Sequence, residues 1–213
     1  LNSDLANILG NLVNRTISMS NKYFGGVVRN AGVTEDVDAD LKAVVLDEVK
    51  KVNDKMDQLR VADAITEIFN IFRRCNKYID ETMPWALAKD EAKKDRLATV
   101  LYNLVEAITI GASLLEAFMP ETSEKILAQL QTEKRELSAM DQFGLYPDGG
   151  KVTDKPEILF ARMDLKEVME KVEAMRAAEA PKEEKKEEPE EAVIDIEAKP
   201  EITYDDFAKL QFQ

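Results

Sequence analysis

The sequence predicts an all-α protein, built as an antiparallel bundle of four or five helices. Across residues 1–130, hydrophobic side chains return at steps of three and four, the period of an amphipathic helix. No segment shows the sustained alternation of apolar and polar residues that is typical of a half-buried strand. Short connections between such helices place sequence neighbours side by side in opposite directions.

The first two expected helices are marked by their ends. One runs from Ser3, a candidate N-cap, to the glycine pair Gly25-Gly26. The next begins near Thr34, where acidic side chains follow and stabilise the first turn through the helix dipole. We expect its buried stripe to consist of Leu41, Val45, Val49, Val52 and Met56.

Three further helices are predicted before residue 131. The third starts at Leu59 and ends where Pro84 interrupts the pattern, and Pro120–Leu130 forms a shorter helix that begins with proline. The third helix should bury Ala62, Ile65, Phe69, Phe72, Cys75 and Ile79. The fourth should bury Leu97, Leu101, Leu104, Ile108, Ala112, Leu115 and Phe118.

Beyond these helices, turn-forming residues predict a loop over Gly144–Pro156, and apolar periodicity returns in a helix from about Asp164 to Glu179. Residues 181–191 consist of Lys, Glu and Pro, which offer nothing to bury, so we expect a disordered acidic linker. The expected organisation is therefore a helical domain over 1–180, a flexible charged linker over 181–201, and the truncated start of another domain over 202–213.

The composition excludes several classes of chemistry. The 213 residues contain 29 Lys plus Arg against 42 Asp plus Glu, a net charge of −13, with no histidine and one cysteine. Imidazole general bases, Ser-His or Cys-His nucleophiles and Cys/His zinc sites are therefore excluded. The acidity argues against nonspecific nucleic-acid binding, but it leaves recognition of a few exposed bases open.

The lone Cys75 suits a reducing compartment, and no apolar run approaches the roughly 18 residues of a membrane span. No signal-peptide pattern opens the chain. We expect a soluble, cytoplasmic protein without a membrane partner. Because the chain begins without Met and stops soon after a domain-like segment, we also expect it to be part of a longer protein.

A polar stripe on the first helix is a candidate binding surface. Asn7, Asn11 and Arg15 are spaced at i, i+4 and i+8, on one helix face, with Asn14 beside them. Amide and guanidinium donors could read base edges there, although a solvated polar face has the same pattern. Gly10 costs about 1 kcal/mol relative to Ala inside a helix, which indicates close approach of another helix or a ligand.

Two other side chains are singled out by their positions. Trp85 directly follows Pro84 at a helix break. A lone Trp usually belongs to a core, but a Trp at such a break lies on a rim, where aromatic rings stack nucleic-acid bases. Arg162 lies just before the helix expected near Asp164. It is a candidate binding residue, and the alternative is that it forms a surface ion pair.

Four stretches, in order, resemble one family. Residues 1–25 resemble the start of the anticodon-binding helical domain of bacterial methionyl-tRNA synthetases, and Tyr78–Lys89, Ile158–Asp164 and Ile202–Lys209 resemble later parts. The Gly-Asn-Leu-x-x-Arg pattern also occurs in related class I synthetases for Leu, Ile and Val. Pro-Trp together with Phe-x-Arg-x-Asp favours Met. In the family, the last stretch opens a C-terminal tRNA-binding OB-fold domain.

The resemblance implies a role for each matching residue. Ala161 stands where many relatives have proline and Met163 where Ile is common, which leaves the position of Arg162 open. By the resemblance, the anticodon loop is contacted by Asn7, Asn11 and Arg15, its first base stacks on Trp85 with Pro84 shaping the backbone, and Asp80 and Arg162 contribute nearby.

The function implied is recognition of the tRNA(Met) anticodon, so that a longer parent enzyme can attach methionine. By the resemblance, this segment holds no catalytic or metal-binding residue and should be inactive alone. ATP, magnesium and zinc would belong to the parent's missing catalytic part, and homodimerisation would involve a missing C-terminal domain.

Two other functions are compatible with parts of the sequence. A helical protein-interaction module could dock its acidic tail on basic partners, without specificity for any tRNA. An enzyme that uses paired carboxylates is a poorer interpretation, because spacing singles out no pair among the many Asp and Glu residues.

Overall fold

The computed structural model describes residues 2–161, 168–173 and 175. The chain divides into two compact units, Leu1–Asp164 and Leu165–Gln213. In the second unit the described residues are helical, within the helix predicted from Asp164 to Glu179. Arg162, the rest of that helix, the predicted linker over 181–201 and the segment over 202–213 lie outside the described residues.

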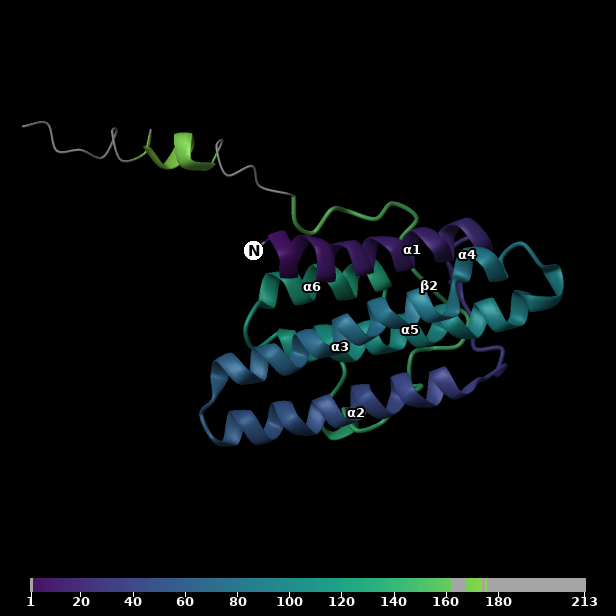
Figure 1. The fold of residues 1–213 in the computed structure, drawn as a ribbon, viewed down its shortest axis with the longest axis horizontal. Helices are drawn as coiled ribbons and strands as arrows, with labels where there is room; N and C mark the ends of the chain where they lie inside the picture. The colour runs from purple at the N-terminus through teal and green to yellow at the C-terminus, as the bar shows by residue number, and fades with distance from the viewer. Residues whose placement is uncertain (1, 162–167, 174, 176–213) are drawn as a thin grey trace, which may run out of the picture. The chain divides into compact units, whose positions relative to one another are not determined.

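The first unit is a bundle of helices, which confirms the predicted all-α class (Figure 1). A nine-residue π-helix, η1, continues directly into α1, so the predicted first helix is present with a wider backbone turn at its start. The elements are η1 (Asn2–Gly10), α1 (Asn11–Phe24), α2 (Asp36–Asp57), α3 (Val61–Thr82), α4 (Pro84–Leu87), η2 (Glu91–Lys93), α5 (Lys94–Leu115), α6 (Pro120–Leu130) and η3 (Leu137–Ala139).

A two-stranded ladder joins the end of α1 to the returning chain. β1 (Val27–Val28) pairs antiparallel with β2 (Gly150–Lys151), with Val27 opposite Lys151. The loop predicted over 144–156 therefore includes a short strand, which a two-residue pattern could not reveal. The N–H of Val152 donates to the carbonyl of Gly26 at 2.9 Å and extends the attachment.

Helix α5 forms the centre of the bundle. Every residue from Arg96 to Leu115 is buried, so the predicted single stripe was too narrow. The stretch Glu91–Leu115 is the one helix in the described residues with the length and apolar composition of a membrane span, which corrects our expectation that no such run exists. Because 94% of its most apolar window is buried inside the bundle, we interpret it as a core helix.

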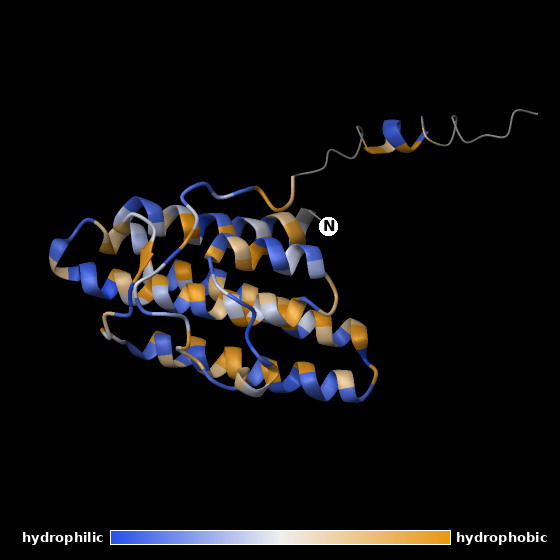
Figure 2. Ribbon diagram, turned by 180° about the vertical axis from the view of Figure 1, so that it is seen from behind, coloured by the Kyte–Doolittle hydropathy of each residue, from blue (hydrophilic) through white to orange (hydrophobic). Residues whose placement is uncertain are grey.

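The outer helices are amphipathic, and each carries both hydrophobic and hydrophilic residues in Figure 2. Cys75 on α3 is fully buried as predicted, and burial raises the pKa of its thiol to about 12. Two predicted core residues are wrong: Met56 and Ala62 are exposed. They lie near the turn between α2 and α3, at the end of one helix and the start of the other.

A buried polar network fixes three helices. The Arg96 guanidinium of α5 binds the Asp38 carboxylate of α2 through two contacts of 2.8 and 3.0 Å. The Tyr78 hydroxyl of α3 donates to the same carboxylate and accepts from the Asn103 amide at 3.2 Å. Burial, followed by the hydrogen bond to Asp38, raises the pKa of Tyr78. Asp38 also accepts from the N–H of Glu35 and so caps α2.

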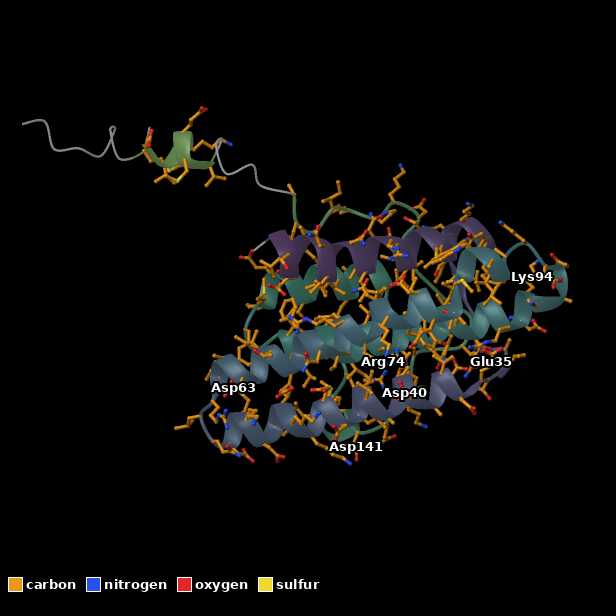
Figure 3. All side chains as sticks on the ribbon, viewed as in Figure 1. Glu35, Asp40, Asp63, Arg74, Lys94 and Asp141 are labelled. Atoms are coloured by element: carbon orange, nitrogen blue, oxygen red, sulfur yellow. The ribbon has the colours of Figure 1, made fainter. Side chains whose placement is uncertain are left out.

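A second connection between α2 and α3 lies nearer the surface. The Arg74 guanidinium, whose side chain is 8% exposed, contacts Asp40 at 2.7 Å and Glu81 at 3.0 Å. Figure 3 shows Arg74 and Asp40 side by side between the two helices. The contact to Glu81 joins the middle of α3 to its last turn, directly before the helix break.

Glu106 attaches the chain that returns after α6 to the middle of α5. Its fully buried carboxylate accepts two contacts of 2.9 Å from Arg135 and hydrogen bonds from three successive backbone N–H groups at Gly144, Leu145 and Tyr146. A carboxylate can accept at both oxygens at once, which no neutral side chain of this size does. Glu106 therefore holds both ends of the segment from 135 to 146.

Glu106→Gln should destabilise the bundle, because the amide offers only one acceptor oxygen and leaves the buried Arg135 charge without an anion. We expect the free energy of unfolding, measured by urea denaturation, to fall by about 3–5 kcal/mol. The control is Glu116→Gln, which removes a surface pair with Lys134 and should cost about 0–1 kcal/mol. Equal effects of the two substitutions would show that Glu106 does not organise this segment.

Candidate nucleic-acid interface

The predicted stripe on η1 and α1 lies at the surface. Asn7 and Asn11 are exposed and Arg15 is half-buried, whereas Leu12 and Ile17 on the opposite side are completely buried. The helix therefore separates a core face from a polar face, as the four-residue spacing predicts. The polar face lies on the surface of the bundle.

The returning chain contacts this helix at Gly10. A Cβ atom at Gly10 would lie 3.5 Å from the Phe160 ring and 3.3 Å from the carbonyl oxygen of Leu5. The prediction of another helix or a ligand at Gly10 is wrong in its partner, because the neighbour is the non-helical segment around Phe160, at ordinary van der Waals distance. Phe160 is half-buried and packs against the core.

A hollow of about 550 Å³ lies between the polar face and this segment. One wall carries amide groups and the other carries apolar side chains, an arrangement that suits a flat ring with polar edges. The lining residues are Ala6, Asn7, Gly10, Asn11, Asn14, Ile158, Phe160 and Ala161.

The break after α3 places Trp85 on the rim. Met83 adopts a left-handed conformation (φ 46°, ψ 63°), which ends α3 and lets Pro84 begin α4. The residue before a proline is disfavoured in the right-handed helical region, so α3 does not continue through this position. Pro84 is buried while Trp85 is 43% exposed, which confirms the predicted exposure of the ring.

A second hollow, of about 260 Å³, connects Trp85 to α1. Figure 1 shows α4 close to the C-terminal half of α1. Asn14 lines both hollows, so they lie next to each other along the polar face, one beside Phe160 and the other beside Trp85. We call this surface the α1 groove. The second hollow is lined by Asn14, Arg15, Ser18, Met19, Lys22, Tyr23 and Trp85.

Arg15 differs from the other described arginines in its charge environment. No carboxylate in the described part of the chain forms an ion pair with it. A buried or surface carboxylate neutralises each of the others: Arg29, Arg60, Arg73, Arg74, Arg96 and Arg135. In an acidic protein, an uncompensated guanidinium inside a groove is a site for an anion or a hydrogen-bond acceptor.

Three of the predicted site residues are not placed in the groove, and the first of them, Pro84, is buried and lines neither hollow. Asp80 is exposed on α3 and lines neither hollow, and Arg162 lies outside the described residues. The second hollow also contains Ser18, Lys22 and Tyr23, which were not predicted as site residues. Asn14, Ser18 and Lys22 are spaced at i, i+4 and i+8, and this spacing is the sequence signal that could have identified Ser18 and Lys22.

The chemistry of the α1 groove is that of binding. Amide and guanidinium donors lie between the rings of Phe160 and Trp85. The described side chains of the groove include no acid paired with a base, which acid–base catalysis would need. The described residues also contain no group of three or more His, Cys, Asp or Glu side chains that could hold a metal ion. Flat groups with hydrogen-bonding edges, such as unpaired bases, fit this arrangement.

Comparison with known proteins identifies similar chains. Residues 28–180 match the family described as the anticodon binding domain of methionyl tRNA ligase. The chain is 41% identical to the methionine--tRNA ligase of Clostridium perfringens and 43% identical to that of Caldanaerobacter subterraneus, over 100% of its own length and 32% of each relative. It thus spans about a third of these relatives.

A solved structure is similar in fold as well as in sequence. The apo form of Mycobacterium tuberculosis methionyl-tRNA synthetase matches with a TM-score of 0.69 and 34% identity, over 76% of this chain and 33% of that one. The family match begins after α1, whereas the two ligases match the whole chain, α1 included.

Stability should distinguish the groove arginine from a core arginine. Arg15→Ala removes no ion pair, so the free energy of unfolding should change by less than about 0.5 kcal/mol. Arg96→Ala leaves the Asp38 carboxylate buried without its partner and should cost about 3–5 kcal/mol. A loss of several kcal/mol in Arg15→Ala, measured by urea denaturation, would show that the polar face is part of the core.

Proposed function

The chain belongs to the family of methionyl-tRNA ligase anticodon-binding domains, and from this membership we propose that the α1 groove binds the anticodon loop of a methionine tRNA. The observation that carries the proposal is that the two neighbouring hollows of the groove share one face. That face brings together an exposed Trp85, an Arg15 with no ion pair among the described residues, and a row of asparagine amides.

Each part of the α1 groove has a role that follows from its chemistry. Trp85 presents an aromatic face on which the first anticodon base stacks, and stacking needs no particular base. Asn7, Asn11 and Arg15 supply hydrogen bonds to base edges, including the edge of the stacked first base, and these bonds do depend on the base. Because the protein carries a net charge of −13, base contacts must supply more of the affinity than phosphate contacts do.

The parent protein is proposed to be a methionine--tRNA ligase that acts in the cytoplasm. This domain would hold the anticodon and thereby position the acceptor end of the tRNA in a catalytic part outside the chain. The sites for ATP, magnesium and zinc that the resemblance implies would also lie there. Homodimerisation through a further C-terminal domain is part of the same proposal.

Binding to anticodon stem-loops tests the proposal. One stem-loop carries the methionine anticodon CAU, and the other differs only in its first anticodon base. We expect the first to bind about 5- to 150-fold more tightly in a gel-shift or filter assay at fixed salt, since one mismatched contact typically costs about 1–3 kcal/mol. Equal affinities would support the alternative function as a helical protein-interaction module.

Trp85→Ala should weaken binding of the CAU stem-loop by 5- to 150-fold, because stacking on one aromatic ring is typically worth about 1–3 kcal/mol. Trp85→Phe retains a smaller ring and should recover part of the loss. As the sole tryptophan, Trp85 also reports binding directly, since its fluorescence should be quenched by the CAU stem-loop. Emission that is indifferent to RNA, with an unstable alanine variant, would place the ring in the core.

Asn11→Ala and Arg15→Ala should each weaken binding of the CAU stem-loop by about 1–3 kcal/mol, the usual value of a good base contact. The thermal midpoint of both variants should stay within a few degrees of wild type. A matched control is Asn53→Ala, which changes an exposed asparagine of α2. If the control lost as much affinity as Asn11→Ala, the amides of the groove would not be the readers.

A further inference from the structure

Lys22 is a second uncompensated cation in the α1 groove. It is exposed and lines the hollow that contains Trp85 and Arg15. Two helical turns separate it from Arg15, a rise of about 10 Å along α1. Its ammonium group lies 5.4 Å from the centre of the Tyr23 ring, a contact that favours a cation at this position.

The acidic side chains near Lys22 contact other groups. Asp90 and Glu91 line a smaller neighbouring hollow with Lys22, but Glu91 pairs with Lys94 at 2.7 Å. Asp90 accepts the N–H of Ala92 at 3.0 Å and caps η2. No carboxylate in the part of the chain that the structure describes forms an ion pair with Lys22. Its charge therefore remains available to a ligand.

The two cations of the groove differ in what they recognise. The Arg15 guanidinium is planar, so it can match the two acceptors of a base edge. The Lys22 ammonium is a compact charge with three rotatable donors, and such a group binds a phosphate oxygen from many directions. A stacked base brings its own phosphodiester near the ring, and Lys22 lines the same hollow as Trp85.

We propose that Lys22 binds a phosphodiester group of the RNA backbone beside the nucleotide whose base stacks on Trp85. This inference rests on the proposed function of the groove. Lys22 positions the strand and does not read its sequence. Removing the charge must therefore weaken every stem-loop by the same factor, whereas loss of Arg15 or Asn11 must reduce the difference between stem-loops.

Lys22→Met tests the inference, because it removes the charge and keeps an unbranched apolar side chain. Dissociation constants are measured for the CAU stem-loop and for its variant changed at the first anticodon base, over a series of salt concentrations. Loss of one phosphate contact should reduce the slope of log K against log salt by about 0.7, or about fivefold in affinity at 0.1 M salt. Lys22→Arg should restore both.

The control is Lys42→Met, which removes an exposed lysine of α2 and should leave affinity and slope unchanged. An unchanged slope in Lys22→Met would overturn the inference, as would a loss confined to the CAU stem-loop, which would make Lys22 a base reader. Equal binding of the two stem-loops by the wild-type chain would overturn the proposed function instead, and the slope would still decide the role of Lys22.

Discussion

The burial of α5 is the constraint on which the rest of the structure depends. A helix enclosed on every side cannot leave a carboxylate without donors, and Glu106 obtains them from the chain that returns after α6. From this point, Tyr146 donates through its hydroxyl to the carbonyl of Leu130, and the carbonyl of Thr153 accepts from the Asn21 amide of α1. The returning segment then reaches Gly10 and supplies the apolar wall of the α1 groove.

The other end of the groove depends on the core in a different way. The left-handed conformation at Met83 costs about 1–3 kcal/mol, so it persists only where the surrounding structure holds the backbone in place. Those surroundings are a buried Pro84 and the last turns of α3, where Tyr78 is held by the Asp38–Arg96 pair. Trp85 is thus an exposed ring on a rigid support, which suits a stacking platform because little motion must be lost on binding.

Local patterns predicted the helices and the polar face, because helical periodicity depends on residues only three or four positions apart. Asn7, Asn11 and Arg15 lie on the surface as their spacing indicates, and Pro84 marks the break that exposes Trp85. Long-range contacts could not be predicted. Nothing in the sequence near Gly10 identifies Phe160 as its neighbour. The full burial of α5 depends on how the other helices pack around it, which its own sequence does not show.

A map of amide and indole chemical shifts during titration with the CAU stem-loop locates the bound RNA without any substitution. Binding in the α1 groove predicts that the largest changes fall on the indole of Trp85, on the polar face of η1 and α1 from Asn7 to Lys22, and near Phe160. It would be contradicted by changes centred on another hollow, of about 500 Å³, between the C-terminal ends of α2 and α5 near Val52 and Met140.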